Sequence, residues 1–432
     1  MGLVLRMRLG EIVEQKNRYF GKEETFVLAL STVVLGLIVG ASSLFLSLFL
    51  DLIERIFLKF KETALEPTSI GISPLHRLLS VLISGIIVAL VWYVLRNRFK
   101  SIIGVKRAVN GDSMPFLATI IDVLTQIFYV GSGGSIGREL APREAGAAIA
   151  QQWQKLIQKW HLTVLSKEDY QLLIASAAGA GFAGVYIAPL AGSFFCLEIL
   201  LKKITPRAIS VSLVMSVIAT LVGSIAKGFG PYYLVKDNNF SFIFLLIILC
   251  IAPICGILGA FFHKSVSLAE KKQTKNWHIL WQLPLAALAT GLIATFFPQI
   301  MGNGRALAQM AMNTSTQGLS YMMLLLFGAV AKVTLTLFTI RSGTAGGTLT
   351  PSISIGAVTG VLLGSILFFI WPSIPIWQCA VVGAVTFLAA AQQAPLMALF
   401  MLIEISHLGY SAFLPLGLGV ALSIGVSRVI LK

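Results

Sequence analysis

The sequence predicts an all-α integral membrane protein, and three observations lead to this fold class. The chain is unusually apolar, its apolar runs have the length of membrane-spanning helices, and glycine-rich interruptions recur in both halves. Of the 432 residues, 56% are hydrophobic and 12% are charged, whereas soluble domains carry about 25% charged residues. A water-soluble fold would leave much of this apolar sequence on its surface. An ordinary soluble enzyme is therefore excluded.

Helical spans are expected wherever the apolar sequence continues for long enough. A helix needs about 20 apolar residues to cross the hydrocarbon core, whereas the strands of outer-membrane barrels alternate over segments of about 10 residues. Because the apolar runs here are continuous, they predict helices and exclude a barrel. The runs cover residues 25–50, 77–94, 240–262, 279–298, 321–340 and 411–430.

The positions of the basic residues predict the orientation, because cytoplasmic loops collect Lys and Arg. Residues 1–24 are basic and lack the features of a removable signal peptide. We therefore expect a cytoplasmic N-terminal segment and a bacterial inner (plasma) membrane location. Segment 51–66, which mixes acids and bases, is expected on the outer side. Basic residues precede the first span and follow the second: Arg6, Arg8, Lys16, Arg18 and Lys22, then Arg96, Arg98, Lys100, Lys106 and Arg107.

The net charge of +15 does not indicate nucleic-acid binding, because the charges are scattered around span ends and form no basic face. The four cysteines lie inside apolar runs without the spacing of a zinc site or a disulfide framework. Neither a metal nor a cofactor is therefore expected.

Two similar segments, one in each half, indicate a duplication. Residues 132–139 and 344–351 are both rich in Gly with Ser or Thr. Downstream of each, an Ala-Pro-Leu sequence is followed by a glutamate nine positions after the proline, Glu198 or Glu404. We expect a first transmembrane repeat at residues 25–226 and a second at residues 240–432, joined by the polar stretch 227–239. No C-terminal regulatory domain is expected.

The interrupted helices point to an anion. Backbone N–H groups outside a helix are tolerated at membrane depth only where they line a cavity or a bound ion. Glycine gives an ion access to those amides, and a helix that begins at the break directs its partial positive charge at the site. Glu139, an ionisable acid in the first break, would compete with the permeant anion until it is protonated. A structural pairing of Glu139 with Arg138 or Arg143 is the alternative.

At these positions the chain resembles the CLC family of chloride channels and proton/chloride exchangers. Residues 137–139, Gly-Arg-Glu, resemble the start of its Gly-Arg-Glu-Gly-Pro motif, and residues 346–351 resemble its Gly-Gly-x-Phe-x-Pro motif. Residues 188–192, Ala-Pro-Leu-Ala-Gly, are also typical of the family, and the stretch from Glu404 to Pro415 resembles its last motif. The motifs occur in family order over most of the chain.

The resemblance implies a homodimer in a lipid bilayer, with a chloride pore in each subunit built from two inverted-topology repeats of many tilted and broken helices. It implies that Glu139 is the gating glutamate and that the amides of Thr348 and Leu349 bind chloride. The segment with Gly137 and Arg138 is expected to bind chloride too. These residues would carry chloride, and the exchangers of the family carry protons as well.

The resemblance also implies that Tyr410 closes the inner side of the site, where its neutral hydroxyl holds an anion weakly enough to release it. A position in the interfacial belt of tyrosines is the alternative. The early Gly-Ser-Gly-Ile-Pro motif of the family is absent. Residues 101–104 are the nearest stretch, so Ser101 is the predicted serine ligand of chloride.

Proton coupling is left open by one departure from the family pattern. Exchangers of this family usually carry a second acid directly after the one that matches Glu198, and here that position is Ile199. Isoleucine cannot carry a proton. Either Glu198 takes part in the proton path through water, or protons reach Glu139 by another route, or transport is uncoupled.

Two other classes of function share features with this sequence. Residues 133–137 fit the Gly-x-Ser-x-Gly pattern of serine hydrolases, but that motif needs a preceding strand and a histidine partner. An enzyme is therefore not expected. A sodium-coupled or other secondary transporter is the stronger alternative, because broken helices also bind sodium through freed carbonyl groups.

Overall fold

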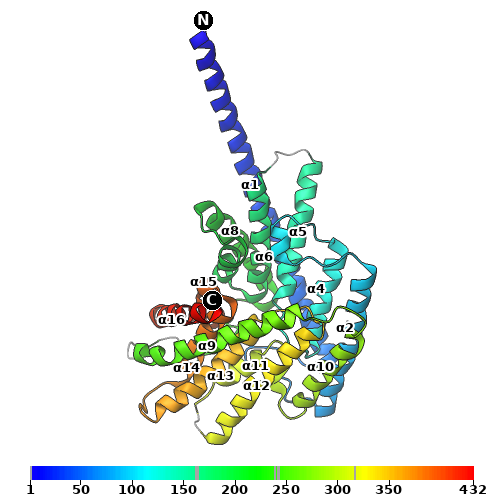
Figure 1. The fold of residues 1–432 in the computed structure, drawn as a ribbon, viewed down its shortest axis with the longest axis vertical. Coiled ribbons are helices and arrows are strands. Elements are labelled where there is room, and N and C mark those ends of the chain that lie inside the picture. Colours follow the sequence, from blue (N-terminus) through cyan, green and yellow to red (C-terminus); the bar gives the residue numbers. More distant parts are fainter. Residues whose placement is uncertain (1, 161–164, 238–239, 241–243, 316–317) are drawn as a thin grey trace.

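The computed structural model describes residues 2–160, 165–237, 240, 244–315 and 318–432 (Figure 1). These residues form an all-helical fold without a β-strand, which confirms the predicted class. The α-helices are α1 (Gly2–Leu58), α2 (Pro74–Arg98), α3 (Val105–Val109), α4 (Phe116–Gly131), α5 (Leu140–Lys159), α6 (Lys167–Tyr186), α7 (Pro189–Phe194), α8 (Pro206–Lys227), α9 (Phe244–Lys271), α10 (Ile279–Ala294), α11 (Arg305–Met312), α12 (Leu319–Arg341), α13 (Leu349–Phe368), α14 (Ile376–Gln392), α15 (Pro395–Ser406) and α16 (Phe413–Leu431). A π-helical turn, η1 (Phe195–Leu201), and two 3₁₀ turns, η2 (Pro298–Ile300) and η3 (Tyr410–Ala412), complete the described elements.

Seven helical segments in the described part of the chain are long and apolar enough to cross a membrane. They are Gly21–Leu58, Pro74–Arg98, Pro206–Ile225, Phe244–Lys271, Leu319–Arg341, Leu349–Phe368 and Tyr410–Leu431. The predicted span at residues 279–298 differs, because α10 ends at Ala294 and Pro298 opens a separate turn. The predicted run 240–262 includes residues 241–243, which lie outside the described residues.

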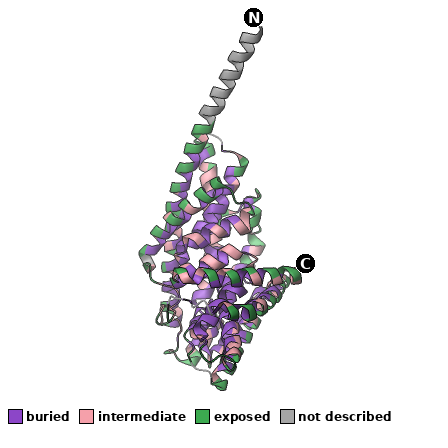
Figure 2. Ribbon diagram, turned by 90° about the vertical axis from the view of Figure 1, so that its left-hand side faces the viewer, coloured by how far each residue is buried: buried purple, intermediate pink, exposed green. Residues whose placement is uncertain are grey.

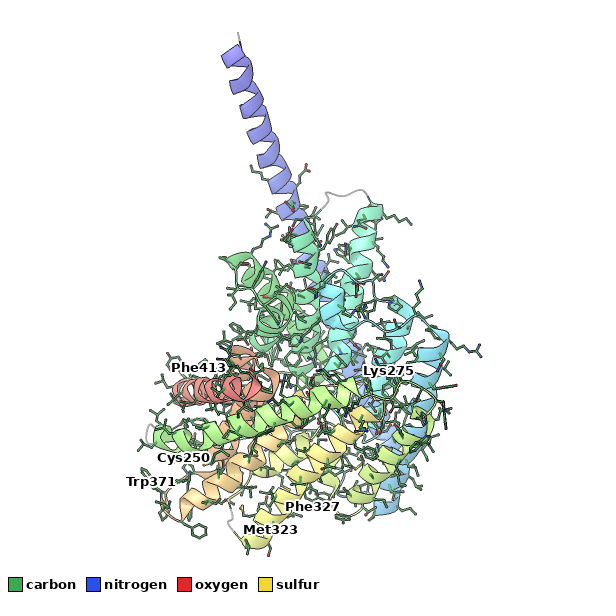
Figure 3. All side chains as sticks on the ribbon, in the orientation of Figure 1. Cys250, Lys275, Met323, Phe327, Trp371 and Phe413 are labelled. Atoms are coloured by element: carbon green, nitrogen blue, oxygen red, sulfur yellow. The ribbon has the colours of Figure 1, made fainter. Side chains whose placement is uncertain are left out.

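The outer faces of these helices are apolar, as lipid requires. Large hydrophobic side chains such as Phe26, Phe45 and Met323 are more than half exposed, and buried residues gather inside the helical assembly (Figure 2). The labelled side chains of Met323, Phe327 and Trp371 project from the periphery (Figure 3). Because water would disfavour this surface, the fold is that of a multi-pass membrane protein.

Side-chain caps and prolines place several helix starts. Ser73 accepts a hydrogen bond from the His76 N–H at the start of α2, at 3.4 Å, and Thr205 accepts one from the Ala208 N–H at the start of α8, at 3.2 Å. Proline is the first residue of both helices, where its missing N–H costs nothing. These caps satisfy N–H groups that have no partner within the helix.

The two Ala-Pro-Leu sequences adopt the same backbone. Ala188 has φ −134° and ψ 76°, and Ala394 has φ −136° and ψ 85°. The residue before each alanine, Ile187 or Gln393, is left-handed, with φ 55° or 53°. Non-glycine residues rarely adopt this conformation. Its recurrence at equivalent positions supports the predicted duplication.

The two copies also cap each other. The carboxylate of Glu198 accepts from the N–H groups of Leu396 and Met397, at 3.0 and 2.9 Å. In return, the carboxylate of Glu404 accepts from the N–H groups of Leu190 and Ala191, both at 2.8 Å. Each acid therefore satisfies the first free amides of the other half's helix, α15 or α7. This reciprocal exchange is what a two-fold relation between inverted repeats produces.

Candidate functional site

The two glycine-rich breaks meet inside the protein. The Gly137 N–H donates to the Gly347 carbonyl oxygen, and the Gly347 N–H donates to the Gly137 carbonyl oxygen, both at 2.8 Å. The pair forms an isolated antiparallel bridge between segments about half the chain apart. The breaks thus lie where the sequence analysis expects them. The Gly137 amide, however, is already used by Gly347, so the prediction that it binds chloride directly is not supported by this geometry.

Glu139 lies at this junction. Its side chain is fully buried, and the Leu349 N–H donates to its Oε1. The second carboxylate oxygen, Oε2, has no hydrogen-bond partner among the described residues. A Cβ atom at Gly137 or Gly347 would overlap the Glu139 carboxylate. Glycine is therefore needed at both positions to make room for the acid.

The carboxylate occupies a place suited to an anion. Leu349 is the first residue of α13, so its N–H has no acceptor within the helix. The partial positive charge of a helix N-terminus favours a negative group there. The predicted anion-binding role of Leu349 is thus matched by the one anionic group within hydrogen-bond distance of its N–H, the Glu139 side chain.

The arginines next to Glu139 do not pair with its carboxylate. No ion pair between Glu139 and Arg138 or Arg143 occurs among the described residues. The Arg143 Nε–H donates to the backbone carbonyl oxygen of Glu139. The Arg138 guanidinium instead lies over the rings of Tyr186 and Tyr232, at 5.3 and 5.4 Å from their centroids. The alternative of a purely structural ion pair is therefore not what the geometry shows.

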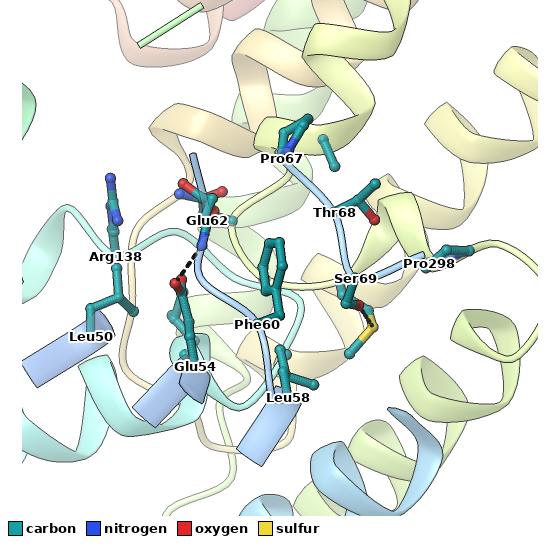
Figure 4. Close-up of a pocket in the computed structure, with 17 residues that line it drawn as sticks. Leu50, Glu54, Leu58, Phe60, Glu62, Pro67, Thr68, Ser69, Arg138 and Pro298 are labelled. Atoms are coloured by element: carbon teal, nitrogen blue, oxygen red, sulfur yellow. Dashed lines mark hydrogen bonds between the residues drawn. The ribbon is translucent and has the colours of Figure 1, made fainter. Parts of the chain in front are cut away.

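A small cavity of about 30 Å³ lies on the Arg138 side of Glu139. Arg138, Glu54 and Glu62 line it, and we call it the Glu62 cavity (Figure 4). The Glu62 N–H donates to Glu54 Oε2 at 2.8 Å, and Arg305 Nη1 donates to Glu62 Oε1 at 2.9 Å. Burial alone would raise the pKa of the Glu62 carboxyl, but the guanidinium groups of Arg305 and Arg138 bring it below its ordinary value. This acid therefore stays ionised.

A larger cavity of about 570 Å³ lies on the other side. Leu140, Arg143, Thr348 and Gln392 line it, and we call it the Gln392 cavity. Arg138 lines one cavity and Leu140 the other. Glu139 lies between these two residues in the chain and lines neither cavity itself.

Two further polar side chains contact the start of α13. The Gln392 Nε2 donates to Thr348 Oγ1 at 3.2 Å, and the Tyr186 hydroxyl lies 3.0 Å from Thr350 Oγ1. Neither residue is predicted from the sequence motifs. Each stands three positions before the proline of an Ala-Pro-Leu sequence. The internal repeat would have identified them as an equivalent pair.

Lys332, a residue of α12, holds the first glycine-rich break in place. Its side chain is fully buried, and its ammonium donates to Ser135 Oγ at 3.0 Å and to the carbonyl oxygens of Ile300 and Gly302, at 3.1 and 2.7 Å. A buried ammonium is tolerated because it has these acceptors. Lys332 therefore fixes the loop that leads to Glu139.

Three predicted site residues lie elsewhere. The Tyr410 side chain is 88% exposed and stacks on Phe413, with ring centroids 5.5 Å apart, so the prediction that it closes the site is wrong. It lies at the start of an apolar span, as the alternative of an interfacial tyrosine expects. Ser101 is exposed and lines neither cavity, so its assignment as a chloride ligand is also wrong. Both carboxylate oxygens of Glu198 cap α15, and no described hydrogen bond joins it to Glu139.

A buried carboxylate on a helix N-terminus, in a fold of membrane-spanning helices, indicates a membrane protein that moves anions. The family model described as "voltage gated chloride channel" matches residues 85–428. The chain therefore belongs to the voltage-gated chloride channel family, which confirms the resemblance of its motifs.

Individual relatives agree with this family. The voltage-gated ClC-type chloride channel ClcB of Salmonella typhimurium is 28% identical over 375 residues, covering 83% of this chain and 85% of the relative. ClcB of Escherichia coli K12 is 27% identical over 378 residues, covering 82% and 85%.

Solved structures share the fold. A slow cyanobacterial Cl⁻/H⁺ antiporter has a TM-score of 0.76 at 21% identity, with 93% of this chain and 94% of that chain covered. A CLC-type fluoride/proton antiporter has a TM-score of 0.66 at 20% identity, with 94% and 96% covered.

Proposed function

We propose that this protein carries chloride across the membrane through a path gated by Glu139, as a channel or as a proton-coupled exchanger. One observation carries the proposal: the Glu139 carboxylate accepts the free N–H of Leu349 at the N-terminus of α13. The relatives named as chloride channels and the antiporters that share the fold support it. Both classes are transport proteins rather than enzymes.

The physical step is competition for one amide. An ionised Glu139 holds the Leu349 N–H and repels a second anion from the same place. Protonation removes the charge, and chloride then takes the N–H in its stead. Weak binding to neutral backbone donors lets the ion leave again. Chloride flux should therefore be higher in acid, where more of this carboxyl is protonated.

The proton path is proposed to bypass Glu198. Both of its oxygens are used to cap α15, and its neighbour Ile199, which lines the Gln392 cavity, has no proton to give. If the protein is an exchanger, water in that cavity is the simplest carrier to Glu139. A proton electrode that records alongside a chloride electrode distinguishes an exchanger from a channel.

The setting in the membrane belongs to the same proposal. We place the N-terminus in the cytoplasm of a bacterial cell, with the Gln392 cavity open to the cytoplasm and the Glu62 cavity open to the outside. The exposed Lys106 and Arg107 at the Gln392 cavity support this orientation. We further propose a homodimer with a separate path in each subunit, the two repeats lying at residues 25–226 and 240–432. Residues 238 and 239 of the predicted join lie outside the described residues.

The replacement Glu139→Gln tests the function. Glutamine keeps the shape but carries no charge, so chloride flux into liposomes should lose its pH dependence and stay at the level that the wild type reaches in acid. Glu66 is exposed, so Glu66→Gln is the matched control. Its chloride flux should depend on pH as that of the wild type does. Unchanged pH dependence of the chloride flux in Glu139→Gln would reject Glu139 as the gate. In the wild type, replacing sodium by potassium should leave the chloride flux unaltered.

A further inference from the structure

The loop between α9 and α10 joins the ends of three helices. Arg96, in the last turn of α2, donates through Nη1 to the Thr274 carbonyl oxygen at 2.9 Å. The Thr274 N–H donates to the carbonyl oxygen of Arg341, the last residue of α12, also at 2.9 Å. Because α9 ends at Lys271, shortly before Thr274, the ends of α2, α9 and α12 meet at this loop (Figure 1).

A shallow polar hollow of about 310 Å³ lies at this loop, and we call it the α10 hollow because α10 begins there, at Ile279. A space of this size is at the lower end for small-molecule sites and has room for a phosphate group. None of the described side chains that line it is acidic, so an anion placed there meets no carboxylate. The lining residues are Gln273, Thr274, Lys275, Asn276, His278 and Gln282.

Two side-chain amides of the α10 hollow have their oxygens in use and their NH₂ groups unused. Gln282 Oε1 accepts from the Thr274 hydroxyl, and Asn276 Oδ1 accepts from the His278 N–H at 3.2 Å. Neither NH₂ group has an acceptor among the described residues, and Lys275 makes no ion pair there. The hollow therefore offers two neutral donors and an ammonium group, which suit the oxygens of a phosphate.

Further basic side chains surround the α10 hollow. Lys271 and Lys272 directly precede it in the chain, and Arg341 is joined to it by the hydrogen bond from Thr274. All three basic residues are exposed, and none forms an ion pair within the described part of the chain. Glu270, which precedes Lys271, lines the Gln392 cavity instead. This excess of positive charge attracts an anionic group to the hollow.

Two tryptophans indicate that the α10 hollow lies at the level of the lipid headgroups. Trp277 is 59% exposed and Trp281 is 48% exposed, and both lie beside Ile279, where the apolar helix α10 begins. Tryptophan is enriched where the hydrocarbon core meets the headgroups, and basic clusters at the ends of membrane helices bind anionic headgroups. Exposed apolar rings beside the hollow suit the glycerol and acyl groups of a lipid better than a soluble phosphate compound.

We propose that the α10 hollow binds the phosphate headgroup of an anionic phospholipid, such as phosphatidylglycerol. The Lys275 ammonium and the side-chain NH₂ groups of Asn276 and Gln282 donate to the phosphate oxygens, and the two tryptophans flank the rest of the lipid. The surrounding basic residues add attraction at longer range. None of the residues that line the hollow lines the Glu62 cavity or the Gln392 cavity, so this lipid site is separate from the proposed chloride path.

Native mass spectrometry of the purified full chain in detergent, with phosphatidylglycerol or phosphatidylcholine added, tests the site. The wild type should bind phosphatidylglycerol more tightly than phosphatidylcholine. Lys275→Gln should raise the Kd for phosphatidylglycerol about fivefold, since one basic residue near anionic lipid contributes about 1 kcal/mol. Lys203→Gln is the matched control. Lys203 is also exposed and stands shortly before a helix, α8, but it does not line the hollow, so its Kd should equal that of the wild type.

Two more variants separate charge from hydrogen bonding. Lys275→Arg keeps the charge and should bind phosphatidylglycerol as the wild type does, whereas Gln282→Ala removes a neutral donor and should bind it several-fold more weakly. A wild type that binds phosphatidylcholine equally well, or an unchanged Kd in both Lys275→Gln and Gln282→Ala, would overturn the site. Displacement of phosphatidylglycerol by millimolar inorganic phosphate would show that free phosphate is the ligand and would overturn the lipid assignment.

Discussion

Glu139 shows how a single residue is set by its neighbours. Its carboxylate is fully buried and holds one N–H. Burial of an ionised group without full pairing is costly, so the surroundings must compensate. The N-terminus of α13 does so through the N–H of Leu349. The same arrangement makes the site attractive to chloride once the glutamate is neutral.

Glu62 gives a prediction at the same scale. The nearby guanidinium groups lower its pKa, so its contribution to stability is complete above pH 4.5, the ordinary value, and is lost as the pH falls through the lowered one. Near pH 7, Glu62→Gln should lower the free energy of unfolding by about 1–3 kcal/mol, the contribution of a charged hydrogen bond. The variant should therefore unfold at a lower temperature than the wild type. Melting curves in detergent check this, and the difference in melting temperature between the variant and the wild type should narrow in strong acid. A difference in melting temperature that widens in acid would contradict the lowered pKa of Glu62.

The reciprocal caps are the main feature at the scale of elements. Glu198→Leu and Glu404→Leu should each destabilise the fold by about 2 kcal/mol, because each leaves two helix N–H groups without their carboxylate. Similar losses of melting temperature are expected, since the two sites are equivalent. Glu198→Gln should leave the ratio of protons to chloride unchanged. A changed ratio of protons to chloride would show that Glu198 takes part in the proton path.

Helices α13 and α14 pack through small residues, which gives a second prediction. A Cβ at Gly360 would overlap the Cys379 carbonyl oxygen, whereas one at Gly425 on α16 meets nothing within 4 Å. Gly360→Ala should therefore destabilise by about 1–3 kcal/mol through overpacking, and Gly425→Ala should be neutral or mildly stabilising. Thermal melting of the two variants measures the contrast. Equal melting temperatures would show that the two helices can move apart at no cost.

The helical fold and the meeting of the breaks could be predicted from the sequence, because span length and glycine spacing are local signals. The positions of Tyr410 and Ser101 could not be predicted, because the spacing of a motif does not show whether a side chain near a helix start faces the cavity. Gln392 and Tyr186 carry no signal of their own and gain meaning only as equivalent positions of the repeat. The shortened α10 was missed because an apolar run does not reveal where Pro298 interrupts it.

At the scale of the whole molecule, the duplication explains why the site lies where it does. Each half supplies one break, and each half's glutamate caps the other half's helix. The apolar outer surface holds the assembly in lipid, so polar groups concentrate at the junction of the halves. The proposed anion path runs through that junction, with the Glu139 carboxylate as its proposed gate.

The central claim is that this carboxylate stands in an anion's place, and bromide in crystals of Glu139→Ala tests it most directly. Bromide scatters anomalously and substitutes for chloride. A bromide peak is expected within hydrogen-bond distance of the Leu349 N–H in the variant, where the wild type has the Glu139 side chain. A variant whose Leu349 N–H faces no bromide at saturating concentration would contradict it.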